Sequence, residues 1–275
     1  MAIRSILLAI VLDGDINRAE PSLKYAQGLA ALENAHLRVI VGVPKITAPS
    51  GMFIPMVRNL LIEANAERRQ SAETFAKKIQ SEAMGAAVTH DIIYDSYLSV
   101  RNHVVSAART TDIVILPQPE SGLSNELDVF QAILFTSGRP VLMVPQTWNR
   151  SATANKIVIA WDGGSCAARA VGDAMSFLEN ADEVVIACVA PDKSKEIAGA
   201  DLAAHLARHC KSLRLDELPP VNEDIAQALH EHANNLRADM RVMGAYGHSR
   251  LREFILGGVT RDVLEFSDIP VLFSH

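Results

Sequence analysis

The sequence predicts an α/β fold of two tandem domains, each with an open parallel sheet covered by helices on both faces. Three observations lead to this prediction. Short β-branched apolar runs alternate with longer stretches of helical periodicity. The same order of signals occurs twice along the chain. The composition is 49% hydrophobic but only 5% aromatic, which is typical of helices packed on buried parallel strands.

The internal repeat is clearest at the start of each half. The first apolar run ends in Asp13 and Gly14, and a matching run near the middle of the chain ends in Asp162 and Gly163. The second copy is shorter between its first strand and its third helix. A single repeat of this length indicates a duplicated domain rather than a solenoid.

Each half is expected to alternate five strands with four helices. In the first half we expect strands at 5–12, 36–43, 87–94, 112–117 and 140–144, and helices at 18–33, 55–84, 97–109 and 125–136. In the second half we expect strands at 156–161, 183–189, 211–217, 239–244 and 270–274, and helices at 165–178, 195–210, 223–237 and 258–266. A polar segment at 145–155 separates the two, which predicts domains at 1–146 and 155–275.

Composition excludes several classes of function. The net charge is −6 and no dense Lys/Arg cluster occurs, so we expect no nucleic-acid binding. The apolar N-terminal run is too short to span a membrane and has no cleavage site after it. Cys166, Cys188 and Cys210 lack metal-site spacing and suit a reducing compartment. We therefore expect a cytoplasmic protein that has no membrane segment.

A glycine motif follows the fourth strand of the second half. Gly244 and Gly247 precede Gly257 and Gly258 with the spacing G-x2-G-x9-G. Ligands of open α/β sheets bind at the carboxyl ends of strands. Glycines there permit close backbone approach, and amides at a helix start favour phosphate, with Thr260 as a further donor. The alternative interpretation is a turn and a helix cap.

This motif resembles that of the universal stress protein family, G-x2-G-x9-G followed by Ser or Thr, combined with an Asp after the first strand, here Asp162. The resemblance implies a Rossmann-like fold that binds ATP or ADP, with or without Mg²⁺. It implies that Asp162 binds ribose, that Val189 lies near adenine, and that the glycines line the ribose and phosphates. The implied site is Asp162, Val189, Gly244, Gly247, His248, Gly257, Gly258, Val259 and Thr260. Gly258 departs from the family's Ser or Thr, which removes a hydroxyl donor.

The first half departs further from the family pattern. The segment from Pro117 to Gly122 lacks the glycine pair, and the next helix begins with Glu126 and Asp128, which would repel phosphate. We therefore expect a degenerate domain without nucleotide binding. Family members pair through their last strands, so 141–143 and 271–273 are expected to lie together, as in an intramolecular pseudo-dimer. A homodimer is also possible.

Other constellations leave alternatives open. His205 and His209 lie four apart on a predicted helix, which fits either a shared metal or a polar surface. The run from Asp162 to Ser165 resembles the phosphate loop of ATP pyrophosphatases but lacks its first Ser and its final Asp-Ser pair. His248 could approach phosphate or lie exposed in a loop. No Walker A or G-x-S-x-G sequence occurs.

The leading functional hypothesis is a stress-response protein that binds ATP or ADP in its second domain and acts by ligand sensing or through unknown protein partners. No general base is evident beside the motif, so no catalytic residue is assigned and at most weak ATPase activity is expected. The alternatives are a slow ATP hydrolase or nucleotide-dependent transferase, and a structural or non-nucleotide ligand-binding module.

Overall fold

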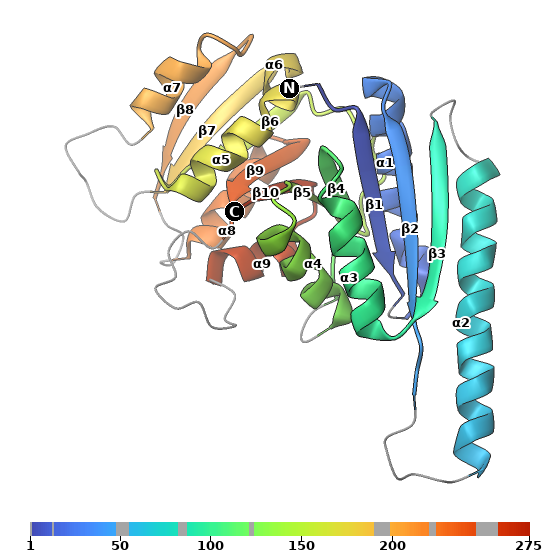
Figure 1. The fold of residues 1–275 in the computed structure, drawn as a ribbon. Helices are drawn as coiled ribbons and strands as arrows, with labels where there is room; N and C mark the ends of the chain where they lie inside the picture. The colour runs from blue at the N-terminus through green and yellow to red at the C-terminus, as the bar shows by residue number, and fades with distance from the viewer. Residues whose placement is uncertain are drawn as a thin grey trace. The chain divides into compact units, whose positions relative to one another are not determined.

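The structure is a computed structural model that describes residues 2–12, 14–47, 55–81, 87–120, 124–189, 199–219, 224–245 and 258–275. Packing divides the chain into two compact units, Arg4–Arg139 and Pro140–His275, with the extreme N-terminus joined to the latter. Both units are α/β structures with the predicted alternation of strands and helices (Figure 1).

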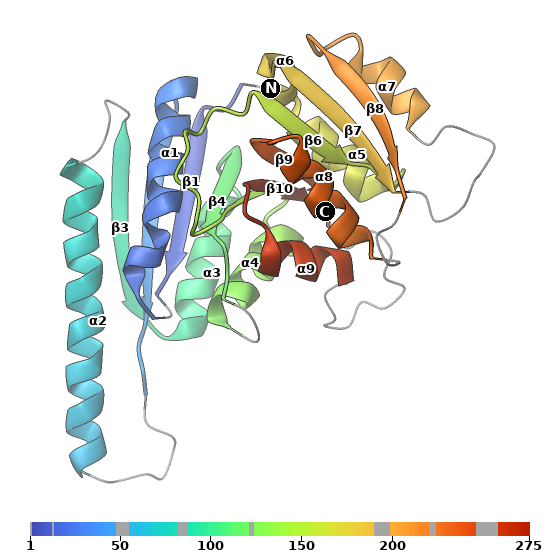
Figure 2. The same cartoon turned by 180° about the vertical axis from the view of Figure 1, so that it is seen from behind.

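The first unit contains a parallel sheet in the order β3-β2-β1-β4. The long helix α2 runs alongside the edge strand β3 (Figures 1 and 2). The strands are β1 (Ser5–Val11), β2 (His36–Pro44), β3 (Val88–Asp95) and β4 (Ile113–Pro117). The helices are the 3₁₀ helix η1 (Ile16–Ala19), α1 (Glu20–Glu33), α2 (Pro55–Ser81), α3 (Tyr97–Ala108) and α4 (Asn125–Thr136).

The second unit has its strands in the order β5-β10-β9-β6-β7-β8. The strands are β5 (Val141–Val144), β6 (Lys156–Ala160), β7 (Glu183–Val189), β8 (Leu213–Leu218), β9 (Met240–Gly244) and β10 (Val271–Ser274). The helices are α5 (Ser165–Asp173), α6 (Met175–Asn180), α7 (Ala200–Leu206), α8 (Ile225–Asn235) and α9 (Gly258–Phe266).

One strand of this sheet runs against the others. β5 pairs antiparallel with β10, with Val141 opposite Phe273 and Met143 opposite Val271, whereas the pairs β10–β9, β9–β6, β6–β7 and β7–β8 are parallel. The expected proximity of segments 141–143 and 271–273 is thereby confirmed. β5 packs with the second unit although it follows the first unit's elements in the chain. The domain limits at 146 and 155 stay a prediction.

A matched aspartate secures the start of the first strand in each unit. The carboxylate of Asp112 accepts a hydrogen bond from the amide of Ser5 at 2.9 Å, and the amide of Asp112 donates to the Ser5 carbonyl at 2.9 Å. Asp239 and Lys156 make the same two contacts, at 2.9 and 2.8 Å. Asp112 and Asp239 therefore have the same structural role in the two units, because each satisfies backbone groups at a strand end.

Most predicted elements are present, with two main differences. The first helix begins as the 3₁₀ turn η1, and Pro21 then lies in the first turn of α1, where its missing amide costs nothing. The predicted helix 165–178 is divided into α5 and α6 at Ala174, just after Gly172, a residue that weakens a helix interior. Of the predicted helix 195–210, residues 195–198 lie outside the described part. No described helix is long and apolar enough to cross a membrane.

Candidate functional site

Three neighbouring strands end together at the candidate site. β6 lies between β7 and β9, and Ala160 at its end is paired with Ala187 of β7 and Met243 of β9. Because parallel strands share a carboxyl edge, Val189, Asp162 and Gly244 meet at the same edge of the sheet. These three predicted site residues, which are distant in sequence, are thus brought together.

Asp162 forms the turn that leads from β6 into α5. Its Oδ1 accepts a hydrogen bond from the Gly164 amide at 2.8 Å, and Gly163 adopts the left-handed region with φ of +75°. A Cβ on Gly164 would lie 3.0 Å from the same carboxylate oxygen. The Asp-Gly-Gly sequence is therefore required locally, because it allows the carboxylate to close a tight turn at Gly164, the residue just before α5.

Gly244 is required by packing as well. A Cβ at this position would lie 2.4 Å from the Ala167 amide nitrogen and 2.6 Å from the Cys166 carbonyl carbon, which α5 could avoid only by moving. Figure 1 shows α5 in front of β9, in agreement with the contacts between the two elements. The sequence predicted a glycine for ligand approach, and the structure adds a close helix–strand contact as an independent reason.

α9 begins with a glycine, so its first residue has no side chain that could cover the backbone. Gly258 is exposed, and a Cβ there would meet nothing within 4 Å. Val259 is half-buried, whereas the side chain of Thr260 belongs to the core at 4% exposure. Of these three residues, Gly258 and Val259 are accessible to solvent, whereas the expected hydroxyl donor of Thr260 is buried with its side chain. Gly247, His248 and Gly257 lie outside the described residues.

Two further side chains lie beside Gly244 and were missed from the sequence. The Sγ of Cys166 is 3.7 Å from Nδ1 of His275, and that nitrogen is 3.1 Å from the carbonyl oxygen of Ala245. Cys166 and His275 are 109 positions apart in the chain. No local pattern connects them. Their positions in the predicted elements were the one usable indication: Cys166 lies at the start of the first helix of the second unit, and His275 directly follows its last strand.

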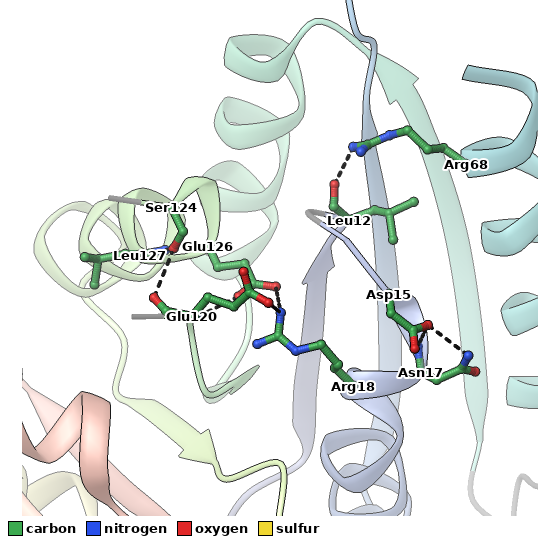
Figure 3. Close-up of polar contacts among 9 residues, drawn as sticks. All are labelled: Leu12, Asp15, Asn17, Arg18, Arg68, Glu120, Ser124, Glu126 and Leu127. Atoms are coloured by element: carbon green, nitrogen blue, oxygen red, sulfur yellow. Dashed lines mark hydrogen bonds and ion pairs between the residues drawn. The ribbon is translucent and has the colours of Figure 1, made fainter. Parts of the chain in front are cut away.

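At the corresponding edge of the first unit, charged side chains of the described residues pair with one another (Figure 3). The guanidinium of Arg18 pairs with Glu120 and lies 3.9 Å from Glu126, whose other carboxylate oxygen accepts from the Glu120 amide at 2.9 Å. Arg68 of α2 donates to the carbonyl of Leu12. Asp13, the counterpart of Asp162, lies outside the described residues.

One cavity at this edge is lined by residues that the structure describes, and it is small. The cavity beside Glu126 has a volume of about 20 Å³ and is lined by Ala9, Val11, Leu116, Pro117, Glu126 and Val129, which is room for about one water molecule. The second predicted carboxylate, Asp128, is paired with Arg101 at 2.7 Å. The acids expected to repel phosphate are therefore both engaged with arginines of the same unit.

The histidine pair of the second unit lies on or just beyond α7. The rings of His205 and His209 are 5.2 Å apart, and Nδ1 of His209 is 3.3 Å from a carboxylate oxygen of Glu179. Within the described ranges, no group of three or more His, Cys, Asp or Glu side chains is arranged to hold a metal ion. Both rings are exposed and lie close to each other, and His209 also contacts the Glu179 carboxylate.

Comparisons with known proteins agree with this fold. The sequence model of the universal stress protein family matches residues 153–275. A solved universal stress protein from Archaeoglobus fulgidus DSM 4304 is similar over 98% of this chain and 95% of its own, with a TM-score of 0.67 and 17% identity. A second solved structure, a Pseudomonas aeruginosa UCBPP-PA14 protein provisionally described as a universal stress protein, is similar over 99% of this chain and 93% of its own. Its TM-score is 0.60 and its sequence identity is 20%. At these identities the two structures establish the tandem α/β fold alone.

A shorter sequence match involves a protein of Bacillus subtilis (strain 168). Its stress response protein NhaX is 45% identical over 49 residues, which is 18% of this chain. The match spans only 30% of the length of that relative.

Proposed function

Since its second half belongs to the universal stress protein family, we propose that this chain is a stress-response protein that binds ATP or ADP in its second domain, residues 155–275. In this proposal the protein acts by ligand sensing or by binding protein partners. The nucleotide would be bound with or without Mg²⁺, and its hydrolysis would be at most weak.

The observation that carries the proposal is the meeting of Val189, Asp162 and Gly244 at adjacent strand ends. Asp162 would bind the ribose hydroxyls, as acidic residues at such strand ends commonly do, and Val189 would contact adenine. The first amides of α9, at the exposed Gly258 and the half-buried Val259, would hold phosphate oxygens, because a helix start carries free donors and partial positive charge. Gly247, His248 and Gly257 stay in the proposed site on the sequence motif, and Thr260 would contribute its backbone amide, because its side chain is buried.

The first domain is proposed to bind no nucleotide. Support comes from the Arg18 pairs with Glu120 and Glu126 and from the cavity of about 20 Å³ beside them. A triphosphate would have to displace these pairs and bring its charge close to two carboxylates, which Coulomb repulsion opposes.

Calorimetric titration of the full chain with ATP and with ADP tests the proposal. Asp162→Asn is the informative variant, because an amide oxygen can still accept from Gly164 and keep the turn. Loss of a charge-assisted hydrogen bond of about 1.5–3 kcal/mol should weaken binding by roughly tenfold or more. The matched control is Asp15→Asn, since Asp15 closes a similar turn on Asn17 at 3.0 Å in the first unit. The Asp15→Asn variant should bind ATP and ADP with the same affinity as the parent protein.

Three results would decide against the proposal. Absence of ATP and ADP binding would favour the non-nucleotide module. If Asp15→Asn and Asp162→Asn weakened nucleotide binding equally, the assignment of the site to the second domain would be wrong. Single-turnover hydrolysis well above the uncatalysed rate would favour the hydrolase alternative.

A further inference from the structure

A separate cavity lies on the other side of β9. Its volume is about 350 Å³, within the range of small-molecule pockets. Arg241 and Gly244 are three positions apart on β9, so their side-chain directions point to opposite faces of the sheet; Gly244 faces α5, and Arg241 faces α8 and α9. Figure 2 shows α8 in front of this face. The cavity is lined by Asp224, Ala226, Gln227, His230, Arg241, Asp262, Val263, Phe266 and Ser267.

Arg241 is a buried cation with unused donors. Its side chain has 0% exposure, and its Nη2 donates to the Leu229 carbonyl at 3.3 Å. Within the described residues, Nε and Nη1 have no hydrogen-bond acceptor. Burial lowers the pKa of the guanidinium to about 10, so it is still charged near neutral pH. Buried charges are ordinarily paired, so an arginine in this state needs a partner that the described protein groups do not supply.

The nearby acids have contacts of their own. Asp268 accepts from Asn234 at 3.2 Å and lies 3.9 Å from His230, with its side chain half exposed. Asp224 caps the start of α8 by accepting from the Gln227 amide at 3.0 Å. Neither makes a hydrogen bond to Arg241 in the described structure, although the charge of Asp268 acts on it at longer range.

We propose that this cavity is a binding site for a small organic carboxylate, which Arg241 holds through its unused N–H groups. The guanidinium matches carboxylate geometry well. The apolar part of the ligand would lie against Ala226, Val263 and Phe266, three of the lining residues. Asp224 and Asp262 line the same cavity and would repel a phosphate dianion more strongly than a carboxylate monoanion. The site is distinct from the nucleotide site, because it lies on the face of β9 opposite α5.

Calorimetry with sodium benzoate and with inorganic phosphate as probes tests this proposal on the full chain at constant ionic strength. Benzoate should bind the parent, and Arg241→Met should weaken it by at least roughly tenfold. Met retains much of the apolar volume, and replacing a buried unpaired charge by an apolar side chain is expected to leave the melting temperature unchanged or raise it. The control is Arg261→Met, because Arg261 is exposed on the same helix α9 and does not line the cavity.

Each outcome is decisive. Benzoate binding that is lost in Arg241→Met and kept in Arg261→Met supports the site. No benzoate binding to the parent at millimolar concentration, or equal binding to Arg241→Met, overturns it. Phosphate binding as tight as benzoate binding would overturn the assignment to carboxylates. If Arg241→Met is poorly folded, Asp262→Asn provides a second test: it should narrow the preference for benzoate over phosphate, and an unchanged preference would contradict the proposed role of the acidic lining.

Discussion

Replacing Gly244 by alanine should destabilise the second unit substantially. The new Cβ would lie 2.4 Å from the Ala167 nitrogen and 2.6 Å from the Cys166 carbonyl carbon, and both of these are backbone atoms that cannot rotate away. Overpacking of a well-packed interior costs about 1–3 kcal/mol. Because the contact is with backbone, we expect the upper end, about 3 kcal/mol. At about 2–4 °C per kcal/mol, the melting temperature should fall by about 6–12 °C.

Gly258→Ala is the matched control for this prediction. A Cβ on Gly258 meets nothing within 4 Å, so the same chemical change is made without a clash. Its effect should lie between zero and a stabilisation of about 1 kcal/mol from reduced freedom of the unfolded chain. The assay is thermal unfolding of parent and both variants, followed by circular dichroism. An unchanged melting temperature for Gly244→Ala would refute the argument that close packing of α5 on β9 requires this glycine.

Three further outcomes are expected. Gly258→Ser should fit without a clash and tighten ATP binding by up to about tenfold through one added donor, whereas Gly258→Ala should not, as titration calorimetry would reveal. Alkylation by N-ethylmaleimide, followed by mass spectrometry, should modify Cys166 first and Cys188 last, because burial, aided by Glu217, raises the pKa of Cys188 to about 11 and hides its thiol. Lys78 and Lys24 lower the pKa of Glu20 to about 2 from its usual 4.5, so this carboxylate stabilises the fold above pH 4.5 and progressively less towards pH 2. In urea titrations, Glu20→Gln should therefore be less stable than the parent at pH 7, with the difference shrinking on acidification or added salt.

The sequence predicted the fold well because its signals are local and repeated. Asp112 and Asp239 directly precede the equivalent strands β4 and β9, and in the structure they make the same backbone contacts. Local sequence patterns could not predict whether the last strands of the two halves, β5 and β10, pair parallel or antiparallel. β5 and β10 are alike in sequence, and their antiparallel pairing depends on contacts between distant parts of the chain.

The candidate site was predictable in its residue types but not in the reasons for all of them. Topology alone is enough to bring Val189, Asp162 and Gly244 to one edge. The contact between Gly244 and α5 could not be predicted, because it depends on how closely a helix approaches a strand. Arg241 did carry a signal: a charged residue in the middle of an otherwise apolar run, Met240–Met243, is unusual for a buried strand.

Matched positions explain why the two units differ at this edge. Gly244 lies five residues after Asp239, and Pro117 lies five residues after Asp112. Ala167 lies five residues after Asp162, and Arg18 lies five residues after Asp13. The small pair Gly244 and Ala167 lets α5 contact β9 through backbone. In the first unit the bulkier counterparts are a proline and an arginine, so the same contact is not available to them. The helical segment there begins as a 3₁₀ turn, and Arg18 extends to Glu120 and Glu126. The residue types at this one helix–strand contact thus explain why, among the described residues, Arg18 forms ion pairs at the strand edge of the first unit.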